Sequence, residues 1–207
     1  MSFQNSTIEF GNITWLILEV REDRMLLLNE KITEQRQFHI NTLDDTTWGK
    51  SSIRKYLNNN FYKRFTLDEQ ALILESSVKN PPNPYYQKTQ GGRTTKDKIF
   101  LLSVEEVVEY FGDSGCLARN SQEWEKRYSS EYEDADDESD YSMSDEYNKA
   151  RIAFDGNGNA VQWWLRTPGV SLISAACVYN CGVIRVGGDC LLNTGLRGIR
   201  PAMWVRI

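Results

Sequence analysis

The chain has one histidine among 207 residues, and its four cysteines do not follow a zinc-binding pattern. Cys177 and Cys181 form a single C-x3-C pair, no second pair is present, and His39 lies far away in the sequence. We therefore expect no bound metal and no cofactor. Free thiols are the expected state of the cysteines, and the alternative is a disulfide or redox site among Cys177, Cys181 and Cys190.

Long hydrophobic runs are also missing. No stretch approaches the roughly 20 apolar residues that a membrane-spanning helix needs, and residues 1–10 lack the basic start and apolar run of a signal peptide. We expect no direct membrane insertion, and the sequence leaves the cytoplasm, the cell surface and a virion open as locations. A basic stripe interleaved with aromatic residues is absent, so we expect no nucleic-acid partner.

The formal net charge of −5 comes from one segment. Residues 129–146 contain nine acidic residues and no basic residue, and the rest of the chain has an excess of bases. A segment that repels itself and has few aliphatic side chains is typical of a solvated, flexible insertion. Binding of a cation or of a basic partner is the alternative for this segment.

A hydrophobic content of 40% and six tryptophans are enough for a sizeable core, so we expect a single domain, residues 1–207. Apolar runs at Ile13–Val20 and Met25–Asn29, separated by a charged turn, predict an antiparallel hairpin. Residues 51–61 place Ile53, Leu57 and Phe61 on one helical face, with Ser51 or Ser52 as the N-cap.

Two capping boxes predict further helices at Leu67–Glu75 and Val104–Phe111. Prolines and glycines between them predict a long loop. The short apolar run Ile99–Leu102 is typical of a buried strand or of a segment that enters the core. The segment Asp155–Asn159 predicts a tight turn. A calcium loop is disfavoured there because Ala160 stands where the motif needs glycine.

From Trp163 onward, short β-rich pieces between glycines predict a series of short strands, ending in an apolar strand that pairs with the N-terminal hairpin. The expected fold class is α+β. Two strongly specified sequences, WWLRTPG and GIRPAMWV, frame a segment of mixed chemistry at residues 170–197. We interpret the frame as scaffold, in which Arg166 and Arg200 donate hydrogen bonds to loop carbonyls. The frame residues are Trp163, Trp164, Arg166, Pro168, Gly169, Gly198, Arg200, Pro201 and Trp204.

Within the framed segment we predict ligand-binding side chains that strand alternation places outward, with Ala176 and Val178 in the core. Aromatic, apolar and arginine side chains on a rigid platform are the types that dominate binding hot spots. The alternative is that some residues of the segment fill the core, especially Leu172, Ile173, Leu191 and Leu192. The candidate ligand-binding residues are Leu172, Ile173, Cys177, Tyr179, Cys181, Arg185, Asp189, Cys190, Leu192, Leu196 and Arg197.

An ordered set of motifs resembles a bacterial and phage family of domains of uncharacterised function, related to the C-type lectin fold and its formylglycine-generating-enzyme branch. The motifs cover nearly the whole chain outside the acidic segment: FGNITWLIL, LLLNEKI, TWGKSSIRKYLNNNF, FTLDEQALI, TKDKIFLLSVEEV, WWLRTPG and GIRPAMWV. The resemblance implies a C-type lectin-like α+β domain whose N- and C-terminal strands pair and whose C-terminal segment forms an exposed face.

The C-terminal frame is also similar to that of the variable proteins of diversity-generating retroelements, in which an error-prone reverse transcriptase rewrites adenines in one stretch of the gene. Each of the eleven candidate residues is of a type that adenine replacement in an asparagine codon can produce. The resemblance implies a non-enzymatic receptor that binds variable, protein-like ligands through these residues. The alternatives are a copper or thiol oxidase related to formylglycine-generating enzymes, using Cys177, Cys181 and Cys190, and an undiversified adhesion or structural module.

Overall fold

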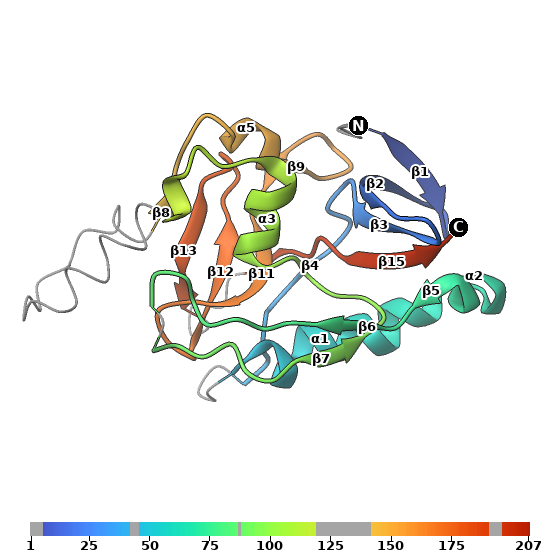
Figure 1. Ribbon diagram of the computed structural model, residues 1–207, viewed down its shortest axis with the longest axis horizontal. Helices are drawn as coiled ribbons and strands as arrows, with labels where there is room; N and C mark the ends of the chain where they lie inside the picture. The colour runs from blue at the N-terminus through green and yellow to red at the C-terminus, as the bar shows by residue number, and fades with distance from the viewer. Residues whose placement is uncertain (1–5, 42–45, 87, 119–141, 191–195) are drawn as a thin grey trace, which may run out of the picture.

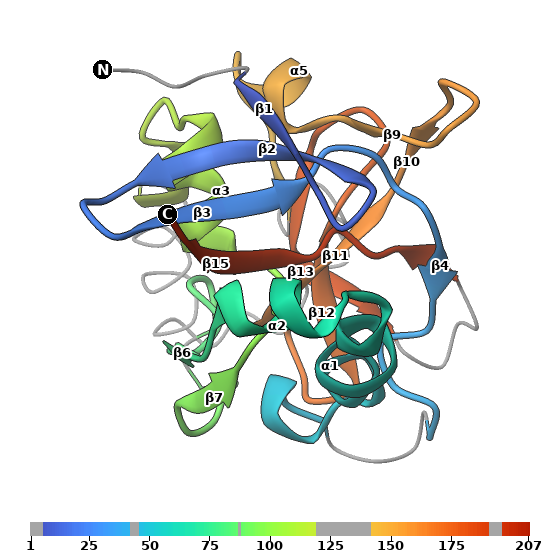
Figure 2. The same ribbon diagram turned by 90° about the vertical axis from the view of Figure 1, so that its right-hand side faces the viewer.

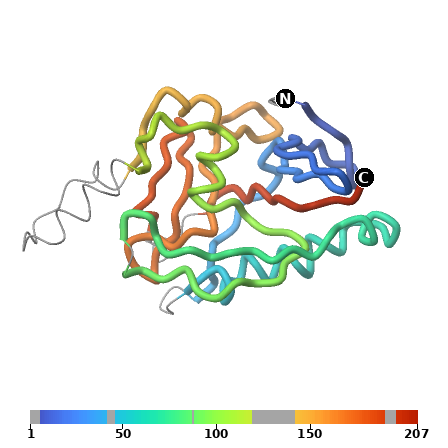
Figure 3. Tube along the Cα trace, viewed as in Figure 1, coloured from blue at the N-terminus to red at the C-terminus, as the bar shows by residue number. Residues whose placement is uncertain are grey.

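In the computed structural model, residues 6–41, 46–86, 88–118, 142–190 and 196–207 are described, except for the side chain of Cys190. The chain forms an α+β structure with two larger antiparallel-rich sheets and helices on more than one side of them (Figures 1 and 3). The strands are β1 (Thr7–Phe10), β2 (Ile13–Val20), β3 (Arg24–Asn29), β4 (Gln35–Arg36), β5 (Ile73–Leu74), β6 (Ser76–Val78), β7 (Thr95–Asp97), β8 (Ser142–Met143), β9 (Ala153–Phe154), β10 (Ala160–Val161), β11 (Trp163–Pro168), β12 (Ser174–Val178), β13 (Ile184–Cys190), β14 (Arg197–Gly198) and β15 (Ala202–Arg206).

The predicted N-terminal hairpin is confirmed as β2 and β3, which pair antiparallel. The C-terminal strand β15 pairs with β3 on one side and with β5 on the other, so the sheet order is β1-β2-β3-β15-β5. Figure 2 shows β15 lying alongside β3, as the sequence predicts. A two-residue turn joins β1 to β2, and both of its residues, Gly11 and Asn12, have positive φ angles of 62° and 57°. Such a turn matches the twist of the strands that it connects.

The second sheet has the order β4-β14-β11-β12-β13-β8 and carries the framed segment. Strand β11 runs antiparallel to β12 and parallel to β14. The register between β12 and β13 shifts where Ala175 faces Asp189 and Cys177 faces Arg185. This β-bulge contains Gly187 and Gly188, and Gly188 has φ +75°. A Cβ atom at Gly188 would lie 2.6 Å from the backbone of Ala175, so the bulge requires glycine.

The predicted helices are present, α3 (Val104–Phe111) has the predicted bounds, and the other two differ from the prediction at their C-terminal ends or in helix type. Helix α1 (Ser52–Tyr56) continues through a π-helical turn, η2 (Leu57–Phe61), and Ser51 caps it by accepting a hydrogen bond from the backbone of Arg54. Both predicted capping boxes are present, at α2 and α3. The remaining described helices are η1 (Trp48–Lys50), η3 (Tyr62–Arg64), α2 (Leu67–Leu72), α3 (Val104–Phe111) and α5 (Asn148–Arg151).

Helix α2 ends at Leu72 and not at Glu75, because Ile73 and Leu74 pair with β15. The predicted long loop between α2 and α3 contains the short paired strands β6 and β7. The predicted turn at Asp155–Asn159 is confirmed: the Asp155 carboxylate accepts hydrogen bonds from the backbone of Asn157 and Asn159 between β9 and β10.

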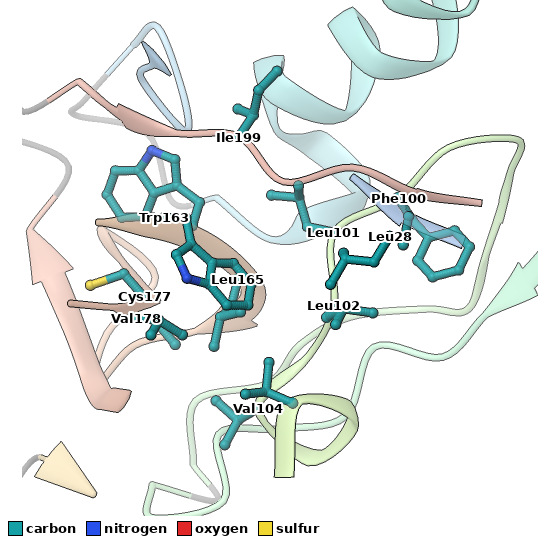
Figure 4. Close-up of a cluster of buried hydrophobic side chains, with 14 of the residues drawn as sticks. Leu28, Phe100, Leu101, Leu102, Val104, Trp163, Leu165, Cys177, Val178 and Ile199 are labelled. Carbon is teal, nitrogen blue, oxygen red and sulfur yellow. The ribbon is translucent and has the colours of Figure 1, made fainter. Parts of the chain in front are cut away.

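The core lies between the two sheets and the helices. Ile99–Leu102 enters it as predicted, and Phe100 forms a β-bridge with Ala202. Figure 4 shows Leu101, Leu102 and Val104 together with Trp163 and Leu165 of β11. All seven residues from Trp163 to Gly169 are buried. Their burial fixes the strand from which the framed segment starts.

The end of the acidic segment is part of the fold, which corrects the prediction of a flexible insertion for residues 142–146. Met143 is fully buried, and β8 pairs with β13. The Asp145 carboxylate pairs with Arg151 at 2.9 Å, and both side chains are almost completely buried. An aspartate that forms an ion pair with a buried guanidinium is fixed in position and is shielded from solvent. Residues 129–141 lie outside the described part of the chain.

None of the helices in the described part of the chain has the length and apolar character that crossing a membrane requires.

Candidate functional site

The two arginines of the frame make their contacts inside the scaffold. Arg166 donates hydrogen bonds to the carbonyl oxygens of Lys79, at 3.2 and 3.1 Å, and of Leu101, at 2.8 Å. It also binds both carboxylate oxygens of Glu106, one of them at 2.6 Å. A bidentate arginine–carboxylate pair holds both groups in one orientation. Arg166 therefore ties β11 to the start of α3, because Glu106 also completes the α3 capping box.

Arg200 is completely buried beside aromatic rings. Its Nε donates to the carbonyl oxygen of Asn29 at 3.0 Å, and its guanidinium lies 5.1 Å from the Trp163 ring centroid and 5.4 Å from that of Phe111. Burial lowers the pKa of Arg200 to about 10, so the side chain remains cationic at neutral pH. Both frame arginines thus face the protein interior.

The framed segment is attached to the rest of the fold mainly through its backbone. The Asn83 side chain donates to the carbonyl oxygens of Pro168 at 2.7 Å and Val186 at 2.8 Å, and so joins β11 to β13. The Thr89 hydroxyl donates to the carbonyl of Val170 at 2.7 Å. Further backbone hydrogen bonds run from Thr46 to the carbonyl of Leu172 and from Val170 to the carbonyl of Gly187. Contacts of this kind do not depend on which side chains the segment carries.

Five candidate residues meet in what we call the Asp189 cluster: Cys177, Tyr179, Arg185, Asp189 and Arg197. The Asp189 carboxylate accepts hydrogen bonds from the Cys177 thiol and from the Tyr179 hydroxyl, each at 3.4 Å. It forms ion pairs with Arg185, at 3.4 Å, and with Arg197. The cluster thus contains two guanidinium groups and one carboxylate.

The frame supports the cluster through a tryptophan. The Arg197 guanidinium lies 4.6 Å from the ring centroid of Trp164, whose indole N–H donates to the carbonyl of Arg36 at 2.8 Å. In the register of the sheet, Trp164 faces Cys177 and Cys177 faces Arg185. Residues in register on neighbouring strands share one face, so one face of β11, β12 and β13 carries the cluster.

Two acid–base groups in the cluster are shifted towards their neutral forms. Burial, together with the nearby Asp189 carboxylate, raises the pKa of the Cys177 thiol well above its usual range. The same two causes raise the pKa of Tyr179 to about 12. A reactive or metal-binding cysteine needs a lowered pKa. Cys177 therefore gives no support to a copper or thiol oxidase, and the described residues contain no group of three or more histidine, cysteine or acidic side chains placed to hold a metal.

A family model matches residues 22–207. The chain belongs to DUF6273, described as a domain of unknown function. No curated protein and no solved structure matches it. The family match covers both larger sheets of this DUF6273 domain except for β1 and β2.

One candidate of this DUF6273 chain requires correction. Cys177 was expected to point outward with Tyr179 and Cys181, but it is fully buried. Every residue of β12 is buried, because β12 is an interior strand and both of its faces are covered. Strand alternation separates a core face from an exposed face only where one side of a sheet is open to solvent.

The other candidates occupy turns and edges. Leu172 and Ile173 are partly buried between β11 and β12, and Cys181, a free thiol, is exposed in the turn after β12. Leu196 has 59% of its surface exposed. Cys190 ends β13, but its side chain lies outside the described atoms, as does the whole of Leu192. The structure therefore brings five of the eleven candidates into direct contact.

Sequence reasoning missed Asn83 and Glu106 as supports of the segment. Asn83 is fully buried, and its side-chain oxygen accepts hydrogen bonds from the backbone of Tyr85 and Tyr86 while its amide reaches β11 and β13. The prolines around Asn83 predict only a break in regular structure. Its partners are more than 80 residues away in sequence, so no local pattern could identify them.

Proposed function

We propose that this DUF6273 domain is a ligand-binding display protein, the variable protein of a diversity-generating retroelement, with a C-type lectin-like fold. Its partners are variable protein ligands that bind side chains of residues 172–197. No catalysis and no cofactor are part of this proposal. The α+β sheets and the pairing of the C-terminal strand with the N-terminal hairpin are compatible with such a fold.

The observation that carries the proposal is the backbone attachment of the framed segment. Asn83 and Thr89 hold the carbonyl groups of Pro168, Val170 and Val186, and none of these bonds uses a candidate side chain. Backbone hydrogen bonds survive a change of side chain as long as the new residue accepts the same backbone angles. A scaffold that binds the segment through hydrogen bonds to its backbone is suited to carrying exchangeable side chains.

The contacts of the candidate residues support the proposal in a second way. The polar contacts of Cys177 and Tyr179 are made to Asp189, which is itself a candidate. Arg197 also pairs with Asp189 and otherwise rests on a frame tryptophan. Replacing these three residues together with Asp189 therefore removes both partners of their mutual polar contacts, and the contact of Arg197 with the Trp164 ring is the frame contact that is lost.

The test compares substitutions in the segment with one in the frame. We expect a combined variant, Leu172→Asn with Cys181→Asn and Leu196→Asn, to keep its folded state, because these side chains lie on turns and edges. The matched frame variant Trp163→Ala is expected to cost about 3–5 kcal/mol of unfolding free energy. Chemical denaturation followed by tryptophan fluorescence measures both.

The binding arm uses a displayed library in which the codons of Leu172, Ile173, Tyr179, Cys181, Arg185 and Leu196 are varied, selected against a panel of purified folded proteins. We expect most members to resist proteolysis and different members to bind different panel proteins. Unfolding of most members would show that these residues are structural and would exclude the display function.

The gene neighbourhood gives an independent test. The proposal requires a reverse-transcriptase gene nearby and a near-copy of the sequence encoding the framed segment that differs only at adenines. A locus with neither would leave the undiversified binding module as the better interpretation.

A further inference from the structure

A second surface lies beside the framed segment, in a groove between β4 and helix α1 with its continuation η2. We call it the β4 groove. It is open and has a volume of about 760 Å³. The walls include Gln35, Arg36 and Gln37 on one side and Lys55 on the other, and Leu196 lies at its margin. Apart from Leu196, the residues named here come from outside the framed segment.

The strand that borders this groove has an edge that no described strand covers. Strand β4 pairs with β14 on one side only and is the last described strand of its sheet. Figure 2 shows β4 at the rim of the molecule, with α1 below it. An exposed strand edge offers backbone N–H and C=O groups to an extended segment of another chain.

The charge of the groove is positive. Arg36 and Lys55 are the charged residues among the described residues that line it. The Glu34 carboxylate is shared by Arg36 and Arg64, each at 3.1 Å, so it neutralises only one of the two. Residues 48–65 contain five basic residues, Lys55 and Arg64 included, and no acidic one, and one of the five, Arg54, is paired with Asp97. The field therefore favours a negatively charged ligand.

Exposed apolar side chains line the same groove as the cations. Ile40 has 76% of its surface exposed and Leu196 has 59%, and both line the groove. An extended peptide places alternate side chains on opposite sides. A segment that alternates acidic and apolar residues can therefore satisfy the cations and the apolar side chains at once.

We propose that the β4 groove binds an extended acidic segment of a partner protein, which adds as a strand to the edge of β4 with its carboxylates at Arg36 and Lys55. This binding does not depend on exchange of the framed segment, because β4 and α1 are parts of the scaffold. A nucleic acid is the less suitable polyanion. Its bases need an open aromatic face for stacking, and the Tyr56 ring is covered by Arg36 at 3.4 Å.

The experiment uses the full chain and a fluorescein-labelled peptide that repeats Glu-Val three times. Fluorescence anisotropy measures the affinity, and NMR of the 15N-labelled protein locates the site. We expect saturable binding, with shifts concentrated at the backbone amides of Gln35 and Gln37. Lys55→Glu is expected to weaken binding by about fivefold or more, because it replaces an attraction by a repulsion. The Lys55 side chain is exposed, so the variant keeps its fold.

The matched control is Lys149→Glu on α5, which makes the same charge change on an exposed residue at the opposite end of the molecule (Figures 1 and 2). We expect it to leave the affinity unchanged. Equal weakening by both variants would show unspecific attraction between charges and would overturn the proposal.

Two further probes separate strand addition from other modes. A peptide that repeats Glu-Pro has the same charge but lacks half of the backbone donors, so we expect it to bind at least several-fold more weakly. Equal affinity for both peptides would overturn strand addition. Binding of an oligothymidylate in the absence of peptide binding would assign the surface to nucleic acid and also overturn the proposal.

Discussion

At the scale of single residues, Asp189 contacts each of the other four residues of its cluster. It is the only carboxylate in contact with Arg185 and Arg197 in the described part of the chain, and all three side chains have 16% or less of their surface exposed. Asp189→Asn keeps the shape and removes the carboxylate that the two guanidinium groups share. We expect it to lower the free energy of unfolding by about 2–4 kcal/mol, measured by urea denaturation.

The control for this variant is Asp23→Asn, at a side chain that is 75% exposed and 3.9 Å from its arginine. An exposed pair of this kind contributes about 0–1 kcal/mol. Equal effects of the two substitutions would mean that the carboxylate of the Asp189 cluster is not needed for the fold.

Asp145 gives a prediction for acid stability. Burial alone would raise its pKa, but the hydrogen bond and charge of Arg151 outweigh burial and lower the pKa below its ordinary value of 3.8. The stabilisation is therefore present above pH 3.8 and is lost as the pH falls through the lower pKa of the folded state. We expect Asp145→Asn to be less stable at pH 7 and to lose less further stability between pH 5 and about pH 2. Thermal unfolding across this range measures the difference, and parallel curves for the two proteins would contradict it.

The sequence predicted some residue roles and missed others for a physical reason. The donor role of Arg166 is foreseeable, because a guanidinium inside an apolar strand must find several acceptors. The burial of Cys177 was not foreseeable, since alternation carries no information about which strands lie inside a sheet. The Asp189 contacts depend on the bulge at Gly187 and Gly188, which shifts the register by an amount that no local pattern states.

At the scale of elements, local signals predicted best. The capping boxes at Thr66 and Ser103 and the N-cap at Ser51 involve residues three positions apart, so the sequence contains both partners. The end of α2 depends on a strand more than 120 residues away. Pairing with β15 overrides the helical preference of Ile73 and Leu74, and such tertiary effects are absent from a local reading.

Asn83 provides the test of how β11 and β13 are joined. Asn83→Ala removes two donors and two accepting contacts from a fully buried site and leaves the carbonyls of Pro168 and Val186 without this partner. We expect a loss of about 2–4 kcal/mol in unfolding free energy.

The control for Asn83 is Asn59→Ala, whose exposed amide donates one hydrogen bond to the carbonyl of Lys55. A loss within about 0.5 kcal/mol is expected there. Hydrogen exchange of the β13 amides should speed up in the Asn83 variant and stay unchanged in the control. Unchanged exchange in both would show that Asn83 does not hold the two strands.

At the scale of the whole molecule, the C-terminal strand completes the five-stranded sheet. Strand β15 lies between β3 and β5, so its removal leaves an edge of each of these strands unpaired and removes the buried side chains of Ala202 and Met203 from the core. We expect a chain ending at Pro201 to show no cooperative thermal transition. A chain ending at Val205, which lacks only two exposed residues, should melt within a few degrees of the full protein.

The fold class and the pairing of the two ends were predictable, because a terminal apolar strand needs partners for its backbone. The order β4-β14-β11-β12-β13-β8 was not. It places β4, β8 and β14, three strands of two residues each, beside the framed segment, and strands of that length have no sequence signature.

Sharing of one carboxylate by two guanidinium groups also constrains how the gene can change. If the framed segment is exchanged as proposed, positions 185, 189 and 197 are coupled, because a neutral residue at 189 removes a charge partner from both arginines. Related copies of the gene should therefore show covariation among these three positions and independent variation at 181 and 196. The number of variants that fold is then limited to those whose charges balance at these positions. It is smaller than the number of variants that the codons could encode.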